Sequence, residues 1–198
     1  PVRDRAAHDL LYLHRGNPAT QELYDYRAMG TATARPAVAA DRAVVVDVLT
    51  RVEGPVRADT VGRLVDDEPG GVVNVLEDGV GGLLGVLVSA RVDDPLQRAA
   101  DPLATAAWDL ICARRPPEPG ECVLQYVVAD ADHPHHVPVI TDIVAAHSLL
   151  TWARPDLGWV VLASRHPDIW APIWTYVGFE ELGAVALEDG STVSVWGR

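Results

Sequence analysis

The sequence contains no lysine, so all 16 basic residues are arginines, and they stand against 28 acidic residues. The absence of lysine excludes Schiff-base catalysis and a phosphate-binding loop that depends on a lysine. The formal net charge of −12 repels nucleic-acid phosphates, and no arginine-rich stripe offsets it. We therefore expect no nucleic-acid partner.

Long apolar runs are also absent, although 48% of the residues are hydrophobic. No run approaches the roughly 20 residues that a membrane-spanning helix needs. No basic segment followed by an apolar stretch marks a secretory signal. We expect a cytoplasmic protein without a membrane partner. The two cysteines, Cys112 and Cys122, are widely spaced, which favours buried thiols over a disulfide.

A length of 198 residues suits one domain with a sizeable core and an appendage. The appendage is residues 1–30, where helical patterns run from Arg3 to Arg15 and from Gln21 to Met29. This helical lead-in is too small to form its own core, so we expect it to dock on the rest of the chain or to link to an upstream domain. The first residue is Pro1 rather than methionine, which suggests a piece of a longer polypeptide.

Residues 31–198 alternate between strand-like and helix-like segments. Asp78-Gly79 lies between two apolar runs and predicts a tight hairpin, since glycine adopts the positive φ of such turns. Residues 93–121 read as an insertion that is first helical and then rich in proline. Strands are expected over 31–35, 72–76, 83–92, 122–129 and 159–163, helices over 43–49, 53–67, 102–112, 139–154 and 168–177, and a closing hairpin around 188–190.

Three short segments of residues 31–198 resemble the GCN5-related N-acetyltransferase (GNAT) family. They are Arg35-Pro36-Ala37 with Asp41 as the expected N-cap of the next helix, the hairpin at Glu77-Asp78-Gly79, and Ala171 to Tyr176-Val177-Gly178-Phe179. The order of the elements is also similar. The resemblance implies an α/β fold with a mixed, mostly antiparallel central sheet flanked by helices. It further implies acyl transfer from acetyl-CoA or another acyl-CoA to a small-molecule or protein amine.

The resemblance also indicates where the cofactor binds. In this family the strands that correspond to 122–129 and 159–163 separate, and the pantetheine chain lies in the gap. A glycine-containing turn before the next helix then holds the pyrophosphate. Here the matching stretch, Asp130 to Ile140, contains no glycine, arginine or glutamine, and protonated histidines are the candidate replacements. The cofactor-binding residues expected on this basis are Val127, Val128, His135, His136, Val139, Ile140 and Trp174.

The catalytic residues depart from the family pattern as well. The family's general acid is a tyrosine four residues before the glycine of Gly178-Phe179, and Trp174 stands there instead. Tyr176 follows two residues later, which is roughly 200° further round a helix. Tyr176, Gln125 and Asp130 are the candidates to act on a substrate amine.

Two other functions fit the same residues. One is a catalytically inactive GNAT-like sensor or docking module of a larger regulatory or ATPase protein, in which aromatic side chains fill the gap between the strands. The other is altered thioester chemistry on CoA or on carrier-bound acyl groups. We expect no metal site, because His133, His135 and His136 lack a standard ligand spacing.

The histidines of the altered loop generate a testable prediction. Acetyl-CoA is expected to bind weakly near neutral pH and more tightly as the pH falls towards 6, because His133, His135 and His136 then gain positive charge. Replacing both His135 and His136 with alanine is expected to remove this pH dependence. Calorimetric titrations between pH 6 and 8 measure it, and tight binding that does not vary with pH would contradict the prediction.

Overall fold

The computed structural model describes Asp9 and residues 12–18, 31–67, 72–115, 117, 120–129, 138–187 and 189–198. Within the lead-in, Asp9, Tyr12 and Leu13 are helical and a turn follows over residues 14–16. The expected helix over 21–29 lies outside the described residues.

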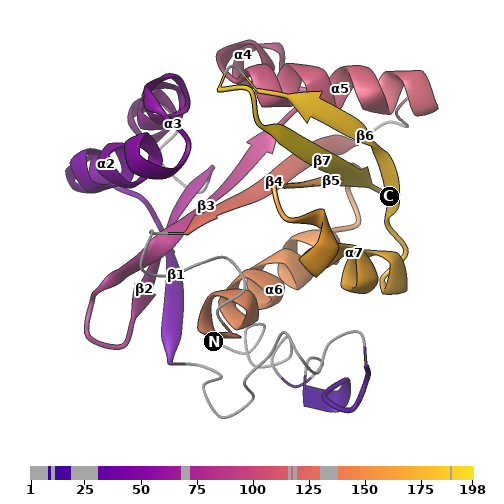
Figure 1. The fold of residues 1–198 in the computed structure, drawn as a ribbon, viewed down its shortest axis with the longest axis horizontal. Helices are drawn as coiled ribbons and strands as arrows, with labels where there is room; N and C mark the ends of the chain where they lie inside the picture. The colour runs from indigo at the N-terminus through magenta and orange to yellow at the C-terminus, as the bar shows by residue number, and fades with distance from the viewer. Residues whose placement is uncertain are drawn as a thin grey trace.

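The described chain alternates strands and helices around one central sheet (Figure 1). The elements are β1 (Ala32–Pro36), the 3-10 turn η1 (Ala39–Asp41), α2 (Arg42–Val52), α3 (Pro55–Asp67), β2 (Val73–Asp78), β3 (Leu83–Arg91), α4 (Pro95–Ala100), α5 (Pro102–Arg114), β4 (Glu121–Ala129), α6 (Pro138–Trp152), β5 (Leu157–Ser164), α7 (Pro167–Tyr176), β6 (Glu180–Ala186) and β7 (Thr192–Gly197).

The sheet has seven strands in the order β1-β2-β3-β4-β5-β7-β6. Only β4 and β5 are parallel, and α6 makes the crossover that joins them. The other neighbouring strands are antiparallel. The mixed, mostly antiparallel sheet flanked by helices is therefore confirmed.

The sheet separates two helical layers (Figure 1). On one face, α2, α3 and α5 cover the larger core cluster, which includes Val48, Val61, Ile111 and Val161. On the other face, α6 and α7 cover two smaller clusters, one around Leu87 and one around Trp174. None of the helices in the described part of the chain is long and apolar enough to cross a bilayer.

Helix α4 was not expected from the sequence. Its short span follows the same Asp-Pro-Leu pattern that begins α5, and in both helices the aspartate is the N-cap. Asp94 accepts a hydrogen bond from the backbone N–H of Leu96 at 2.8 Å, and Asp101 accepts one from Leu103 at 2.9 Å. Proline suits the first turn, because its missing N–H has no partner there in any helix.

The segment from Arg35 to Asp41 differs from expectation in one respect. Asp41 precedes α2, but its carboxylate makes no capping bond to that helix. Instead it accepts a hydrogen bond from the backbone N–H of Val38 at 2.8 Å and a bidentate pair from Arg35 at 2.7 and 3.0 Å. Arg35 also binds Glu77 of β2 at 2.6 Å. The motif therefore ties the turn before α2 to the edge of the sheet.

Gly85 allows β3 and β4 to approach closely near the end of β4. A Cβ atom on Gly85 would lie 2.6 Å from the carbonyl oxygen of Val128. This steric requirement, rather than phosphate binding, accounts for that glycine of the hairpin sequence.

The N-cap aspartates provide a matched stability test. Asp94→Ala removes only a cap and is expected to lower the free energy of unfolding by about 1 kcal/mol. Asp101→Ala also removes the hydrogen-bonded carboxylate of the buried Arg57 guanidinium and leaves it only Glu53 at 3.9 Å. Because breaking a buried ion pair is costly, we expect a loss of about 3 kcal/mol or more. Urea denaturation compares the two variants, and equal losses would show that the buried pair adds nothing.

The Arg35–Asp41 pair predicts a loss of stability in acid. Hydrogen bonds from Arg35, and then from the Val38 backbone, lower the pKa of Asp41 below its usual value. The charged carboxylate therefore favours the folded state above the unfolded-state pKa of about 3.9, and this contribution disappears as the pH falls below it. Asp41→Asn is expected to cost about 1 kcal/mol at pH 7, since Arg35 is partly exposed. Its denaturation midpoint is expected to approach that of the wild type near pH 2.

Candidate functional site

The two parallel strands separate before β4 ends. Pairing between β4 and β5 stops at Tyr126 and Ala163. Pairing between β3 and β4 continues to Gly85 and Ala129. The last three residues of β4 therefore extend along β3 without β5 beside them.

The hydrogen-bond alternation decides which backbone groups of β4 face the separation. The N–H of Val92 donates to the carbonyl of Cys122 at 2.8 Å, so this pair is hydrogen-bonded. In an antiparallel ladder such pairs alternate, so the even-numbered residues of β4 bond to β3. The backbone groups of Val127 and Ala129 consequently point away from β3, towards the side from which β5 has diverged.

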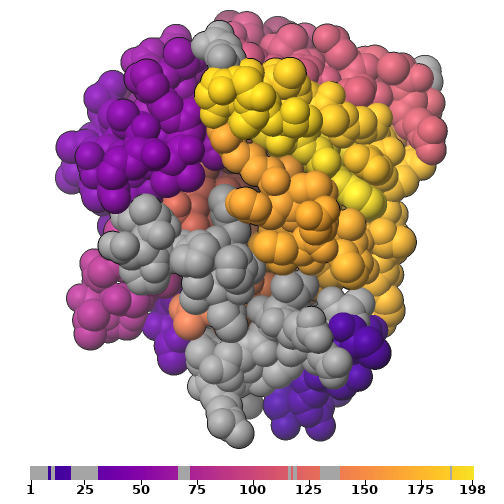
Figure 2. Space-filling model, viewed as in Figure 1, coloured from indigo at the N-terminus to yellow at the C-terminus, as the bar shows by residue number. Residues whose placement is uncertain are grey.

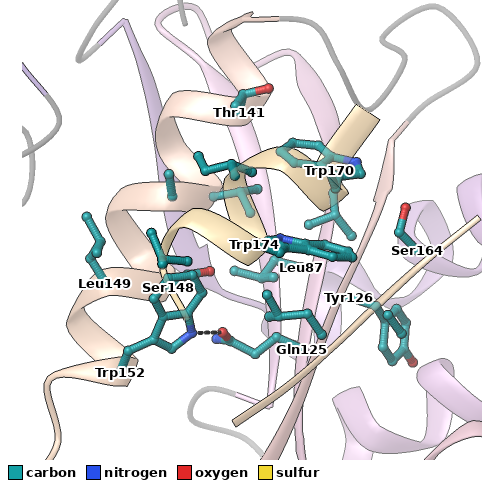
Figure 3. A pocket seen from close by; sticks show the side chains of 17 residues that line it. Leu87, Gln125, Tyr126, Thr141, Ser148, Leu149, Trp152, Ser164, Trp170 and Trp174 are labelled. Atoms are coloured by element: carbon teal, nitrogen blue, oxygen red, sulfur yellow. Dashed lines mark hydrogen bonds between the residues drawn. The ribbon is translucent and has the colours of Figure 1, made fainter. Parts of the chain in front are cut away.

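A pocket of about 110 Å³ adjoins this separation, between α6 and α7 and above β4 and β5 (Figure 3). Its lining is mostly aliphatic and aromatic. The lining residues are Leu87, Gln125, Tyr126, Val127, Thr141, Val144, Ala145, Ser148, Leu149, Trp152, Leu162, Ala163, Ser164, Trp170, Ile173, Trp174 and Val177.

One end of the pocket is closed by a hydrogen bond between Trp152 and Gln125 (Figure 3). The indole Nε1–H of Trp152 donates to Gln125 Oε1 at 3.1 Å. The amide nitrogen of Gln125 donates to Ser89 Oγ at 3.1 Å and to Thr151 Oγ1 at 3.4 Å. Gln125, a candidate catalytic residue, lines the pocket, and these three bonds hold its amide in place.

Tryptophans form the wall that α7 contributes. Trp174 is buried and packs against Trp196, with ring centroids 5.8 Å apart. Trp170 stacks on Trp174 with centroids 6.2 Å apart and an interplanar angle of 15°. The predicted site residue Trp174 therefore lines the pocket, and its ring leaves the space beside α6 open (Figure 3).

The opposite face of the strand separation carries a buried polar network. The Tyr126 side chain points away from the tryptophans, and its hydroxyl donates to Asp101 Oδ2 at 3.1 Å (Figure 3). Arg57 donates to the other oxygen of Asp101, and its guanidinium lies 4.6 Å from the centre of the Tyr126 ring. Burial, and then the Asp101 charge, raises the pKa of Tyr126 well above its usual value. The phenol therefore stays protonated.

A second arginine extends this network across three loops. Arg165, which follows β5, donates to Glu53 at 2.8 Å and to Asp189 at 3.0 Å. Glu53 lies in the turn between α2 and α3, 3.9 Å from Arg57, and Asp189 lies in the β6–β7 hairpin. In the space-filling view, the surface is hollowed between the α2–α3 pair and the C-terminal part of the chain (Figure 2).

Not every residue expected to bind the cofactor lies at the pocket. Val127 does, but Val128 is buried in the core under α2 and α3. Ile140 and Val139 pack against the cluster around Leu87 instead of lining the pocket. His135 and His136 lie outside the described residues, as does Asp130.

The candidate acid Tyr176 lies outside the pocket lining. Its side chain is 50% exposed, and its hydroxyl is 3.2 Å from Nδ1 of His14 in the lead-in. This geometry follows from its position on α7, two residues beyond the pocket-lining Trp174.

The sequence interpretation missed the residues that close and flank the site. Trp152 was read only as part of a helix, Ser148 was considered as a nucleophile and set aside because no nucleophile-elbow glycines surround it, and Arg57 pairs with Asp101 across 44 positions. The one local signal was the capping pattern Asp101-Pro102-Leu103, which does not reveal the arginine. Burial raises the pKa of the Cys122 thiol to about 11, so it is no nucleophile, and Cys112 is exposed rather than buried. Among the described residues, no group of three potential ligands is arranged to hold a metal.

At the sequence level, no protein-family model and no curated protein matches the chain. Solved structures do match its backbone. The loading GNATL domain of CurA from Lyngbya majuscula aligns with a TM-score of 0.55 at 13% identity, covering 84% of this chain and 96% of that one. Arabidopsis thaliana NAA60, solved with a bisubstrate analogue, aligns with a TM-score of 0.51 at 12% identity, covering 85% and 98%.

The aminoglycoside acetyltransferase AAC(6')-Ib, solved in complex with coenzyme A, also matches. Its TM-score is 0.51 at 16% identity, and the alignment covers 84% of this chain and 94% of that one. The strand order, the single parallel pair and these similarities agree, and they identify the fold of the chain as that of the GNAT acetyltransferases.

Proposed function

We propose that this protein transfers an acyl group from a pantetheine thioester, such as an acyl-CoA, to an amine. The observation that carries the proposal is the separation of β4 from β5 after Tyr126 and Ala163, with an apolar pocket beside it. A thioester in this gap has access to both faces of the sheet. The acyl donor then lies on one face and the acceptor approaches from the other.

Features of the described chain fit such a donor. The backbone groups of Val127 and Ala129 point into the separation, where the amides of a pantetheine chain can pair with them as a further strand does. The N-terminus of α6 lies at one end of the pocket, and its first turn carries no acidic residue. Its N–H groups and positive dipole favour a phosphate. Structural neighbours solved with coenzyme A and with a bisubstrate analogue support a donor of this class.

The acceptor side favours an amine. Around the separation, the carboxylates of Glu53, Asp101 and Asp189 outnumber the guanidiniums of Arg57 and Arg165 by one. This excess of negative charge, like the net charge of −12, attracts a cationic acceptor. Bound thioester supplies an activated carbonyl. The bound ammonium first loses a proton to solvent, and the neutral amine nitrogen then bonds to the carbonyl carbon. The carbon–sulfur bond breaks with its electron pair going to sulfur, and the thiolate takes up the second amine proton and leaves as the free thiol.

A second candidate function is that of an inactive sensor or docking module. It is favoured by Trp174, which is buried where the resemblance expects a catalytic tyrosine. It is also favoured by Tyr176, which is turned towards His14 instead of the pocket. The two candidates differ in whether a thioester binds and reacts.

Titration with CoA and with pantetheine tests the proposed function. Both are expected to bind, and free thiol is expected to appear when acetyl-CoA is mixed with a primary amine such as spermidine. Ala129→Pro removes a backbone N–H that points into the separation, while the hydrogen-bonded pairs of β3 and β4 remain. Losing one hydrogen bond is expected to weaken pantetheine binding about tenfold.

Thermal melting provides the folding control for Ala129→Pro. Equal affinities for CoA and pantetheine would indicate that the nucleotide adds nothing, which favours a carrier-bound thioester over free acyl-CoA. Failure of both ligands to bind at pH 6 and pH 7 would overturn acyl transfer and leave the docking module.

A further inference from the structure

We propose that Arg165 determines the specificity for the acceptor: its guanidinium holds the place of a second ammonium, so the preferred acceptor is an amine with a single positive charge. This inference rests on the proposed function, because it names the acceptor class of that same site. It concerns the face of the sheet opposite the pocket, where Glu53, Arg165 and Asp189 meet.

Arg165 lies on the acceptor side of the strand separation. It comes two residues after Ala163, the last residue of β5 that pairs with β4. Side chains alternate between the faces of a strand, and Val161 and Ala163 belong to the core cluster under α2, α3 and α5. Arg165 continues this alternation and bridges the α2–α3 turn and the β6–β7 hairpin. The surface is hollowed between these parts of the chain (Figure 2).

The charges of the polar network match one ammonium. Asp101 and Arg57 form a buried pair whose charges cancel. Among the described residues of the network, Glu53 and Asp189 then stand against Arg165 alone. One negative charge remains, and an acceptor with one ammonium neutralises it.

Glu53 is the carboxylate available to that ammonium. Its Oε2 accepts the hydrogen bond from Arg165 at 2.8 Å and lies 3.9 Å from Arg57 Nε. Its Oε1 has no hydrogen-bond partner among the described residues. Only 8% of the side chain is exposed, so a bond from an ammonium to Oε1 is screened less than a bond at the surface.

Asp189 marks the place that a second ammonium would need. Its Oδ1 accepts hydrogen bonds from the backbone N–H and the hydroxyl of Ser191 at 2.9 and 2.6 Å, and its Oδ2 accepts the bond from Arg165 at 3.0 Å. The bonds from Ser191, and then the bond from Arg165, lower the pKa of Asp189 to about 2, so the carboxylate is charged. A second ammonium would therefore find this carboxylate already bonded, beside a guanidinium of like charge.

Two amines of equal length test this inference. Pentylamine and 1,4-diaminobutane have the same number of non-hydrogen atoms, but the diamine carries a second ammonium. The kcat/KM for thiol release from acetyl-CoA is measured with each amine on the full chain. We expect the wild type to favour pentylamine, because the guanidinium repels the second ammonium.

Arg165→Gln is expected to shift the ratio of the two kcat/KM values towards the diamine by about tenfold, because Glu53 and Asp189 can then each bind an ammonium. A bridge that only tied the loops together would alter stability and leave this ratio unchanged. An unchanged ratio, with thiol still released, would overturn the inference while the proposed function stands.

Two further variants assign the effect to the charge at this position. Arg154 also bridges two carboxylates, Glu121 and Asp156, but at the opposite end of the β4–β5 pair. Arg154→Gln is therefore the matched control and is expected to keep the wild-type ratio. Arg165→Lys retains the positive charge and is expected to keep the preference for pentylamine, and a shift as large as that of Arg165→Gln would contradict the inference.

Asp189→Asn decides the question if Arg165→Gln does not fold. The Asp189 side chain is 41% exposed, so this substitution disturbs little packing. It leaves the Arg165 guanidinium with one carboxylate fewer, so the second ammonium is repelled more strongly. The ratio is expected to move further towards pentylamine, and a ratio that stays constant or moves towards the diamine would contradict the inference.

Titration with the amines alone separates the failures of the two proposals. Calorimetry measures the binding of pentylamine and 1,4-diaminobutane to the wild type and to Arg165→Gln without any CoA. The expected preference and its shift, without thiol release from acetyl-CoA, would support the inference and overturn the proposed function. Failure of both amines to bind, together with no thiol release, would overturn both.

Discussion

The pocket and the buried polar network both depend on one constraint, which is that pairing between β4 and β5 ends at Tyr126 and Ala163. β4 stays bonded to β3 as far as Ala129, so its last residues keep their extended conformation when β5 diverges. Gly85 contributes to this, because any side chain there would collide with the β4 backbone. The separation opens a pocket on the face of α6 and α7, and a buried polar network lies beside it on the opposite face.

The insertion between β3 and β4 contributes α5, which supports the site from the face of the sheet opposite the pocket. α5 begins with Asp101, whose carboxylate caps the helix and also binds Arg57 of α3 and Tyr126 of β4. One buried carboxylate thus joins three elements next to the strand separation. Burying these charges carries a large desolvation penalty, which the pairing of Arg57 with Asp101 offsets in part, although Arg57 Nε has no hydrogen-bond partner among the described residues. The network therefore tolerates little rearrangement, whereas the apolar pocket on the other face accepts ligands by shape and size.

The sequence interpretation was accurate for features that depend on neighbouring residues. It was less accurate for features that depend on residues far apart in the chain. The β2–β3 hairpin was predicted correctly, but the positive φ that was expected at Gly79 is found at Gly81. The Asp78 carboxylate holds the turn by accepting hydrogen bonds from the backbone N–H groups of Val80 and Gly82. Asp41 is the N-cap residue of α2 as expected, but its oxygens bind Arg35 instead of the helix N–H groups, and Arg35 in turn binds Glu77 of another strand. Gln125 was proposed as a catalytic residue from its position on β4, and it lines the pocket. Its bonds to Ser89 and Trp152, which hold its amide in place, come from elements far apart in the chain.

The sequence alone determined the order of the elements apart from α4, the mixed sheet and the acidic, lysine-free character of the protein. These features depend on local periodicity, turn residues and composition. Only the tertiary structure decided that Trp152 closes a pocket, that Trp174 forms its wall, and that Arg57 meets Asp101. The physical reason is that a cavity and a buried charge pair are properties of side chains brought together by packing. No local pattern in the chain specifies which distant side chain fills a space or neutralises a charge.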